Sequence, residues 1–512
     1  MVRQLWQLST VRVCSMTLLL AVAPNPASAS AERDAAAYVA RIAKIDRAGP
    51  RLISVIAINP DWRTQARALD QETLKNGARS PLHGKAILIK DNIETKDNMA
   101  TTAGSLALAA NITGRDAPLV ARLRSGGALI LGKTNLSEWA NIRSNRSMSG
   151  WSAVGGIVRN PYALDRTACG SSSGSGAAVA AGLAWAAIGT ETDGSVACPA
   201  SINGVVGLKP TVGLVSRTHV VPISHSQDTP GPMTRTVRDA ALLLGGMAGS
   251  DPADAATAEA DRRQTDYAAA LTGSVVGVRI GVLRGQVGDN PALKAVFEAA
   301  LARLQGAGAV LIDIAKVDAP SGLGAAEGTV LYTELKADLN AYLASTPAAV
   351  ATRTLADVIA FNTANAAREM PYFGQETFVR AQATKGLDDP DYLKALALSR
   401  DGARATLTRL LTDNKIAMLV APTYGPAWLT DPVHGDQYEG PSASSLPAMS
   451  GYPHLTVPMG QVMGLPVGLS FVGPAWSEAV LLNAGDAYER VRGPFPAPTF
   501  APTVGASLDP VR

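Results

Sequence analysis

Cysteine and histidine are scarce in this chain. Its 512 residues include only three cysteines and five histidines. So few thiolate and imidazole groups exclude a disulfide framework and leave a metal cluster without support. We therefore expect Cys169 and Cys198 to pack as small apolar groups, and we expect no metal and no other cofactor.

The chain also lacks an excess of charge of either sign. Its 46 basic and 43 acidic residues leave a formal net charge of +3, with no block of like charge. A protein that follows a nucleic-acid backbone needs a basic stripe or patch, so we expect no nucleic-acid partner. Hydrophobic residues make up 47% of the chain, which is enough to bury a large core.

The apolar run near the N-terminus is too short to cross a bilayer. Residues 16–23 are apolar, but Pro24 ends the run well before the roughly 20 residues of a spanning helix. Arg3 and Arg12 precede the run, and the small residues 27–29 fit a signal-peptidase site. We interpret residues 1–29 as a secretory signal peptide. The protein is then expected to be exported, periplasmic or secreted, with no stable membrane insertion after cleavage.

Helical and strand patterns alternate along the rest of the chain, which we expect to form a single domain over residues 30–512. Alternating βα units favour a largely parallel sheet that is covered on both faces. Residues 321–413 have a mostly helical pattern and should flank or cover that sheet. The individual predictions are helices at 35–45, 119–123 and 293–304, strands at 52–58, 86–89, 128–131, 275–283, 310–314 and 416–420, and a hairpin at 455–473.

A stretch rich in glycine, serine and alanine at residues 166–213 interrupts the alternation. Such a composition is typical of flexible linkers, but this stretch also contains Val179, Leu183, Ile188 and Leu208. A solvated linker would not carry these side chains. We expect the stretch to be buried, with small residues that allow close backbone packing.

Two short motifs suggest other chemistry, and both fail on context. Residues 127–134 match the phosphate-loop pattern GxxxxGKT, yet the four residues between its glycines are apolar and form the strand themselves. Residues 170–174 match the nucleophile-elbow pattern GxSxG, which would make Ser172 the nucleophile. That elbow needs a later histidine, and neither His434 nor His454 lies in a recognisable setting.

The sequence resembles the amidase signature family over most of its length. The resemblance rests on LHGKAILIKDN at residues 82–92 and on the whole of residues 169–213, within a core motif region at 82–235. Further matching motifs are GKTNLSEWAN, CGSSSGS, GTETDGS and GYPHLTVPMGQ. Within the family these motifs are most similar to those of peptide amidases. The resemblance implies an α/β fold with one large twisted mixed sheet that helices cover on both faces.

The family uses a Ser-Ser-Lys triad, and the matching positions imply Ser195 as nucleophile, Ser171 as bridging serine and Lys90 as base. A serine hydroxyl needs a neighbouring base, and a lysine can be that base only when it is neutral. Lys90 ends the apolar run 86–89, so burial should lower its pKa. The alternative is an exposed charge at a strand end. The resemblance also implies a cis peptide bond between Gly170 and Ser171.

The resemblance further implies an oxyanion hole built from the backbone N–H groups of Thr192, Asp193, Gly194 and Ser195. Gly170, Ser172 and Ser173 are expected to support the site, although the two serines could equally cap a helix. Asp193 departs from the commoner glycine, and it could contact substrate or only bond to a loop. A cysteine at 169 is another departure. The mature chain is also expected to begin at the second helix of the family.

The function implied is hydrolysis of the C-terminal carboxamide of peptides to free acid and ammonia through an acyl-enzyme. One alternative is a broad amidase acting on small aliphatic or aryl amides. A transamidating subunit that acts on charged transfer RNA shares the fold, but the export signal and the lack of a basic face argue against it. An alternative of another class is a non-catalytic binding protein, which has no need of an intact triad. Besides a peptide or small-molecule amide substrate, we expect no obligatory partner subunit.

Overall fold

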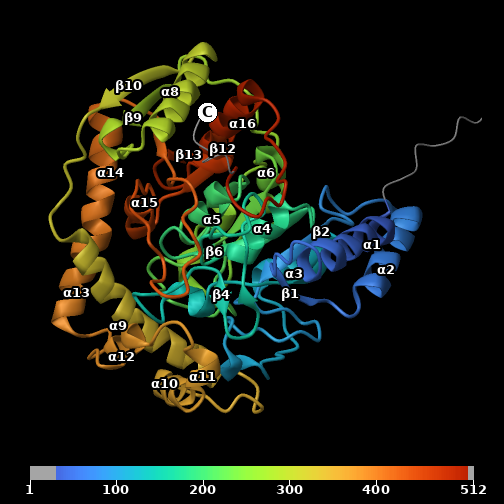
Figure 1. The fold of residues 1–512 in the computed structure, drawn as a ribbon. Helices are drawn as coiled ribbons and strands as arrows, with labels where there is room; N and C mark the ends of the chain where they lie inside the picture. The colour runs from blue at the N-terminus through green and yellow to red at the C-terminus, as the bar shows by residue number, and fades with distance from the viewer. Residues whose placement is uncertain (1–29, 506–512) are drawn as a thin grey trace, which may run out of the picture.

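A computed structural model describes residues 30–505, so the predicted signal peptide at 1–29 lies outside the described residues. One mixed sheet of eleven strands forms the centre (Figure 1), in the order β1-β3-β2-β6-β8-β7-β12-β13-β11-β9-β10. The strands are β1 Val55–Ile58, β2 Ala86–Lys90, β3 Leu129–Thr134, β6 Ala186–Glu191, β7 Val206–Lys209, β8 Thr229–Thr234, β9 Arg279–Leu283, β10 Val310–Ile314, β11 Met418–Pro422, β12 His454–Val462 and β13 Leu465–Val472. A separate short ribbon pairs β4 Trp151–Ser152 with β5 Gly156–Ile157.

The sheet is parallel at two places and antiparallel between them. The parallel pairs are β2 with β3 and β6, and β9 with β10 and β11. The other six pairs are antiparallel, among them the β12–β13 hairpin. The mixed sheet expected from the family is therefore confirmed. The largely parallel sheet expected from the alternation is wrong for the centre, where β7, β8 and the β12–β13 hairpin pair antiparallel with their neighbours.

Helices pack on both faces of the sheet, each burying an apolar cluster. One cluster joins α3 Pro118–Ser125, α6 Val237–Met247, α8 Pro291–Gly306 and α16 Glu478–Arg492 to the strands. The other joins the strands to α1 Ala31–Arg41, its continuation Ile42–Arg47, α2 Trp62–Asn76, α4 Ser173–Ala180 and α5 Ala197–Ile202. The stretch 166–213 thus supplies α4, β6, α5 and β7, and the linker alternative is excluded.

Residues 321–413 are mostly helical, and their helices run from the lower end of the molecule up one side in the view of Figure 1. The segment contains α9 Leu323–Ala344, α10 Leu355–Ala364, α11 Ala366–Glu369, α12 Glu376–Gln382, α13 Pro390–Leu396, the turn Ala397–Asp401 and α14 Gly402–Asp413. Leu335 and Leu339 of α9 pack against Ala103, Leu108 and Trp139, which lie in loops that follow β2 and β3. These contacts place α9 over the carboxyl ends of those two strands.

Two short helices and four 3-10 turns complete the described elements. The helices are α7 Ala260–Arg263 and α15 Ser445–Ser450, and the turns are Leu106–Leu108, Glu138–Asn141, Ala255–Thr257 and Arg284–Gln286. None of the helices between residues 30 and 505 combines the length and the apolar character needed to cross a bilayer.

Candidate active site

Lys90 is the last residue of β2, and its side chain is completely buried. Its Nζ lies 2.7 Å from Ser171 Oγ, 2.8 Å from Thr190 Oγ1 and 3.2 Å from the Thr190 carbonyl oxygen. Thr190 stands near the end of β6, which is parallel to β2, so the carboxyl ends of both strands lie at the same edge. The exposed-lysine alternative is therefore excluded, and Lys90 contacts two hydroxyls and one carbonyl.

Burial lowers the pKa of Lys90 to about 7, against the weaker opposing effect of Asp228 and Glu191. Both carboxylates are engaged by other donors. Asp228 accepts from Thr192 Oγ1 at 2.5 Å, and Glu191 accepts from two backbone N–H groups at the start of α5, both at 2.8 Å. Because no carboxylate is paired directly with its ammonium, burial favours the neutral amine that a base requires.

Ser171 lies in the loop before α4. Its peptide bond to Gly170 is cis, as the family resemblance implied. The Ser171 carbonyl accepts from the Ser137 N–H at 3.0 Å. A side chain at Gly170 would collide with the Ser137 hydroxyl, so only glycine fits this close approach. The loop thereby presents the Ser171 hydroxyl to Lys90.

Ser195 stands between β6 and α5, and 7% of the residue is exposed. The backbone N–H of Ser172 donates to the Ser195 carbonyl at 3.1 Å, which ties the two serine-bearing loops together. In the described residues, no hydrogen bond joins the hydroxyls of Ser171 and Ser195, and the N–H groups of Asp193, Gly194 and Ser195 donate to no protein acceptor. The backbone amides of this loop therefore remain available to bind an incoming oxygen.

Gly194 requires its glycine for two reasons. Its φ of 79° lies in the left-handed region, and a side chain there would collide with Tyr424 and Ser444. Tyr424 and Ser444 are themselves hydrogen-bonded at 3.0 Å. The loop that carries Ser195 is therefore packed tightly beneath the segment that follows β11.

The hydroxyls of Ser172 and Ser173 bond to neighbouring backbone and do not cap a helix. Ser172 Oγ donates to the Thr190 carbonyl at 3.1 Å, and Ser173 Oγ donates to the Cys169 carbonyl at 2.5 Å. Ser172 holds the N-cap position of α4 but makes no side-chain cap. These contacts favour the supporting role over the capping role, and they leave Ser172 turned to Thr190 and not placed as a nucleophile.

Cys169 and Cys198 form a disulfide, and the expectation that they pack as separate apolar groups is wrong. The two cysteines are 29 positions apart, yet their Cα atoms lie 6.0 Å apart because the Ser171 and Ser195 loops meet there. The cysteine count argues only against a framework of several disulfides. It does not argue against one bridge that staples two adjoining loops.

Residues 127–134 are the end of a turn and strand β3, so the phosphate-loop pattern has no loop to hold a phosphate. Lys133 is completely buried, and its Nζ lies 3.6 Å from Asp91 Oδ1. It also donates to the Ile93 carbonyl at 2.6 Å and to Thr101 Oγ1 at 2.8 Å. Lys133 thus fastens the loop that follows β2.

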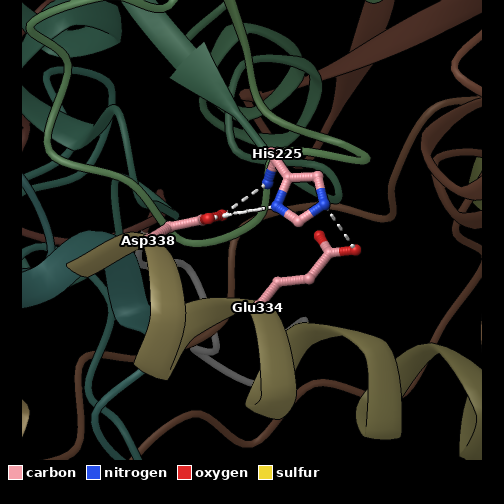
Figure 2. Close-up of side chains that lie close together, drawn as sticks. All are labelled: His225, Glu334 and Asp338. Atoms are coloured by element: carbon pink, nitrogen blue, oxygen red, sulfur yellow. Dashed lines mark hydrogen bonds and ion pairs between the residues drawn. The ribbon is translucent and has the colours of Figure 1, made fainter. Parts of the chain in front are cut away.

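His225, Glu334 and Asp338 form a cluster with the ligand types of a metal site (Figure 2). The backbone N–H and Nδ1 of His225 each lie 2.9 Å from Asp338 Oδ2, and Nε2 lies 3.4 Å from Glu334 Oε1. Ser226 Oγ and Tyr392 also donate to Glu334, at 2.6 and 2.8 Å. Hydrogen bonds account for the whole cluster, which joins α9 to the loop that carries Asp228.

Sequence reasoning missed Thr190, Asp228, Gln227 and Glu327 around this site. Thr190 lies inside the GTETDGS motif, five residues before the expected nucleophile, and this position could have indicated that it belongs to the site. The other three come from distant segments. Gln227 Nε2 donates to the Thr192 carbonyl at 3.3 Å and to Glu327 Oε1 at 2.9 Å.

Comparison with known proteins gives consistent matches over nearly the whole chain. The family model described as "Amidase" matches residues 36–482. A probable amidase from Arabidopsis thaliana, At4g34880, is 40% identical over 464 residues, covering 88% of this chain and 85% of the relative.

Two solved structures of peptide amidase are also similar. Native peptide amidase from Stenotrophomonas maltophilia is 48% identical, with a TM-score of 0.86. Peptide amidase PAM in complex with the competitive inhibitor chymostatin is 50% identical, with a TM-score of 0.88. Each match covers 92% of this chain and 96% of the other.

Proposed function

Because this chain belongs to the amidase signature family, and is a hydrolase of that family close to peptide amidase, we propose that it hydrolyses the C-terminal carboxamide of peptides. We assign Ser195 as nucleophile, Ser171 as proton relay and Lys90 as base. The observation that carries this assignment is the contact of 2.7 Å between the buried Lys90 Nζ and Ser171 Oγ.

A neutral Lys90 suits the first step of this reaction. Its lone pair accepts the Ser171 hydroxyl proton, while its two N–H groups donate to the two oxygens of Thr190. Ser171 in turn takes the proton of Ser195 as the Ser195 oxygen forms a bond to the amide carbon. The negative charge that develops on the carbonyl oxygen is stabilised by the amides of residues 192–195.

The second half of the reaction returns the proton. Lys90, now an ammonium, passes a proton through Ser171 to the leaving nitrogen as the carbon–nitrogen bond breaks, and ammonia departs. Water then attacks the Ser195 ester and gives its proton to the same relay, which returns the proton to the Ser195 oxygen as the ester bond breaks. The products are the free acid, ammonia and the original enzyme, so atoms and charge balance.

The similarity to two peptide amidase structures supports a peptide amide as substrate over small aliphatic or aryl amides. The Cys169–Cys198 disulfide supports export, because disulfides persist in oxidising compartments. We propose a periplasmic or secreted enzyme that acts on its amide substrate without a partner subunit or nucleic acid.

The test is ammonia release with mass spectrometry of the product, from an amidated peptide and a simple aliphatic amide in parallel. We expect the peptide to become the free acid with its internal bonds intact. Ser195→Ala should reduce turnover to background. If Ser195→Ala still releases ammonia, the assignment of the nucleophile is wrong, and if only the simple amide reacts, the substrate assignment is wrong.

A further inference from the structure

Two carboxyl side chains lie together beside the nucleophile. Asp193 is two residues before Ser195, and Glu327 lies in the second turn of α9. The Gln227 side chain links their segments, since it donates both to the Thr192 carbonyl and to Glu327 Oε1. The pair therefore connects the catalytic loop to the helical segment 321–413.

The acidic face of α9 explains why Glu327 reaches this loop. Glu327, Glu334 and Asp338 are spaced by seven and four residues, so they lie on the same side of the helix. Glu334 and Asp338 are bonded to His225 and its neighbours, two turns or more further along. That anchorage fixes the rotation of α9 and directs Glu327 toward Asp193.

Burial and mutual proximity make it unfavourable for both carboxyl groups to ionise. Burial and the neighbouring Asp193 raise the pKa of Glu327 to about 8. Burial also raises the pKa of Asp193, but nearby Ser444, Ser445 and Glu327 oppose that shift. Two carboxylates this close do not both ionise readily, so Glu327 holds the proton and Asp193 remains the acceptor.

Asp193 is half-buried, and its carboxylate is not fully satisfied by hydrogen bonds. Its Oδ1 is inaccessible to solvent and has no hydrogen-bond partner in the described residues. Leaving a buried acceptor unsatisfied is unfavourable, so a ligand N–H that reaches it is bound preferentially. The tight packing of Tyr424 and Ser444 over Gly194 holds the backbone of this loop in place.

We propose that Asp193 accepts a hydrogen bond from the N–H on the α-carbon of the substrate's terminal amide, with Glu327 holding Asp193 in position. This inference rests on the proposed function and adds a basis for its specificity. In a peptide amide that N–H is separated from the reacting carbonyl carbon only by the α-carbon, and Asp193 is correspondingly close to Ser195. Simple aliphatic amides have no such N–H. Asp193 thus selects acylated α-amino amides.

The experiment compares kcat/KM for three substrates that differ at one group. They are N-acetyl-phenylalanine amide, its analogue methylated on the α-nitrogen, and 3-phenylpropionamide, which lacks the acylamino group. The wild-type enzyme should prefer the first substrate. In Asp193→Ala, turnover of the first should fall about 10–100-fold more than turnover of the other two, as expected for a lost hydrogen bond to a charged group.

Three further variants separate recognition from folding. Asp193→Asn, which keeps the shape but loses the charge, should give an intermediate loss of preference. Glu327→Gln still offers a donor to Asp193 and should keep the preference, whereas Glu327→Ala should weaken it. Asp391→Asn is the control, because it removes an exposed carboxylate from the same helical segment that takes no part in anchoring α9, and it should keep the preference.

An equal loss for all three substrates in both Asp193 variants, at wild-type melting temperature, would overturn the inference. Asp193 would then contribute to the turnover of every amide and not to recognition of the acylamino group. That failure is distinct from failure of the proposed function, which would appear as wild-type enzyme that releases no ammonia from N-acetyl-phenylalanine amide.

Discussion

Lys90 is the last residue of β2, and Lys133 is the last but one of the neighbouring parallel strand β3; both side chains are completely buried, yet their surroundings differ. Lys133 lies beside the carboxylate of Asp91, with its Nζ 3.6 Å from Oδ1. Lys90 contacts the hydroxyls of Ser171 and Thr190 and no carboxylate. Burial lowers the pKa of both lysines, but only Lys133 has a directly paired carboxylate that opposes the shift. The comparison indicates that a buried lysine can act as a base when no carboxylate is paired with it.

Replacing Lys90 should have the largest effect on catalysis. We expect Lys90→Met to lower kcat by about 10²–10⁴-fold, the range for loss of a general base, because the thioether side chain of the variant cannot take the Ser171 proton. The measurement is steady-state ammonia release from an amidated peptide. Lys133→Met is the matched control, with one buried ammonium removed from the adjacent strand. A loss of kcat per folded molecule as large in the control as in Lys90→Met would contradict the distinction between the two lysines.

Replacing Lys133 should instead have the larger effect on stability. Lys133→Met leaves the buried Asp91 carboxyl without its partner, and breaking such a pair costs about 3–5 kcal/mol. Burial already raises the pKa of Asp91 to about 6, although Lys133 opposes the rise. Denaturant unfolding at pH 7 measures the loss. The double variant Lys133→Met with Asp91→Leu should recover part of it, and no recovery would show that the pair is not the cause.

The Cys169–Cys198 disulfide joins the two loops that carry Ser171 and Ser195, close to the end of β2 that carries Lys90. Replacing both Cys169 and Cys198 by serine should lower the free energy of unfolding by about 2–4 kcal/mol, because the bridge restricts the unfolded chain over a 29-residue separation. Thermal unfolding with and without reductant provides the measurement. In unfolded mature protein that has not been reduced, we expect no thiol to react with a thiol reagent. Two reactive thiols would contradict the bridge.

Lys90 should also make stability depend on pH. Its pKa is about 7 in the folded chain and near its usual 10.5 in the unfolded chain, so the unfolded chain binds an additional proton between these values. The free energy of unfolding contributed by this group therefore rises as pH increases from 7 toward 10, and is lowest below 7. Denaturant unfolding across this window should show a steeper rise for the wild type than for Lys90→Met. Identical slopes would place the Lys90 pKa elsewhere.

Much of this architecture could be predicted from local sequence. The apolar run 86–89 followed by Lys90 predicted both a strand and a buried base, because the strand carries the lysine into the core with it. The predicted strands and helices exist, with ends that differ by a few residues. The motif positions also brought Lys90 to Ser171 as expected.

What the sequence did not reveal depends on contacts between distant segments. The Cys169–Cys198 bridge requires two loops to meet across the end of the sheet, and Glu327 reaches Asp193 only because α9 packs over that end. The antiparallel centre of the sheet also depends on how β7, β8 and the β12–β13 hairpin pair, which no local period encodes. Local patterns report propensity and burial, and they carry little information about contacts between residues that are distant in the sequence.

The most direct test of the central claim is the pH dependence of kcat/KM for an amidated peptide, measured at several temperatures. If neutral Lys90 is the base, kcat/KM should rise tenfold per pH unit below an apparent pKa near 7 and level off above it. Ionisation of an ammonium is strongly endothermic and that of a carboxyl group is not, so this pKa should fall on warming. A pKa that does not move with temperature would assign the rise to a carboxyl group such as Asp228 or Glu327 and would contradict the role of Lys90.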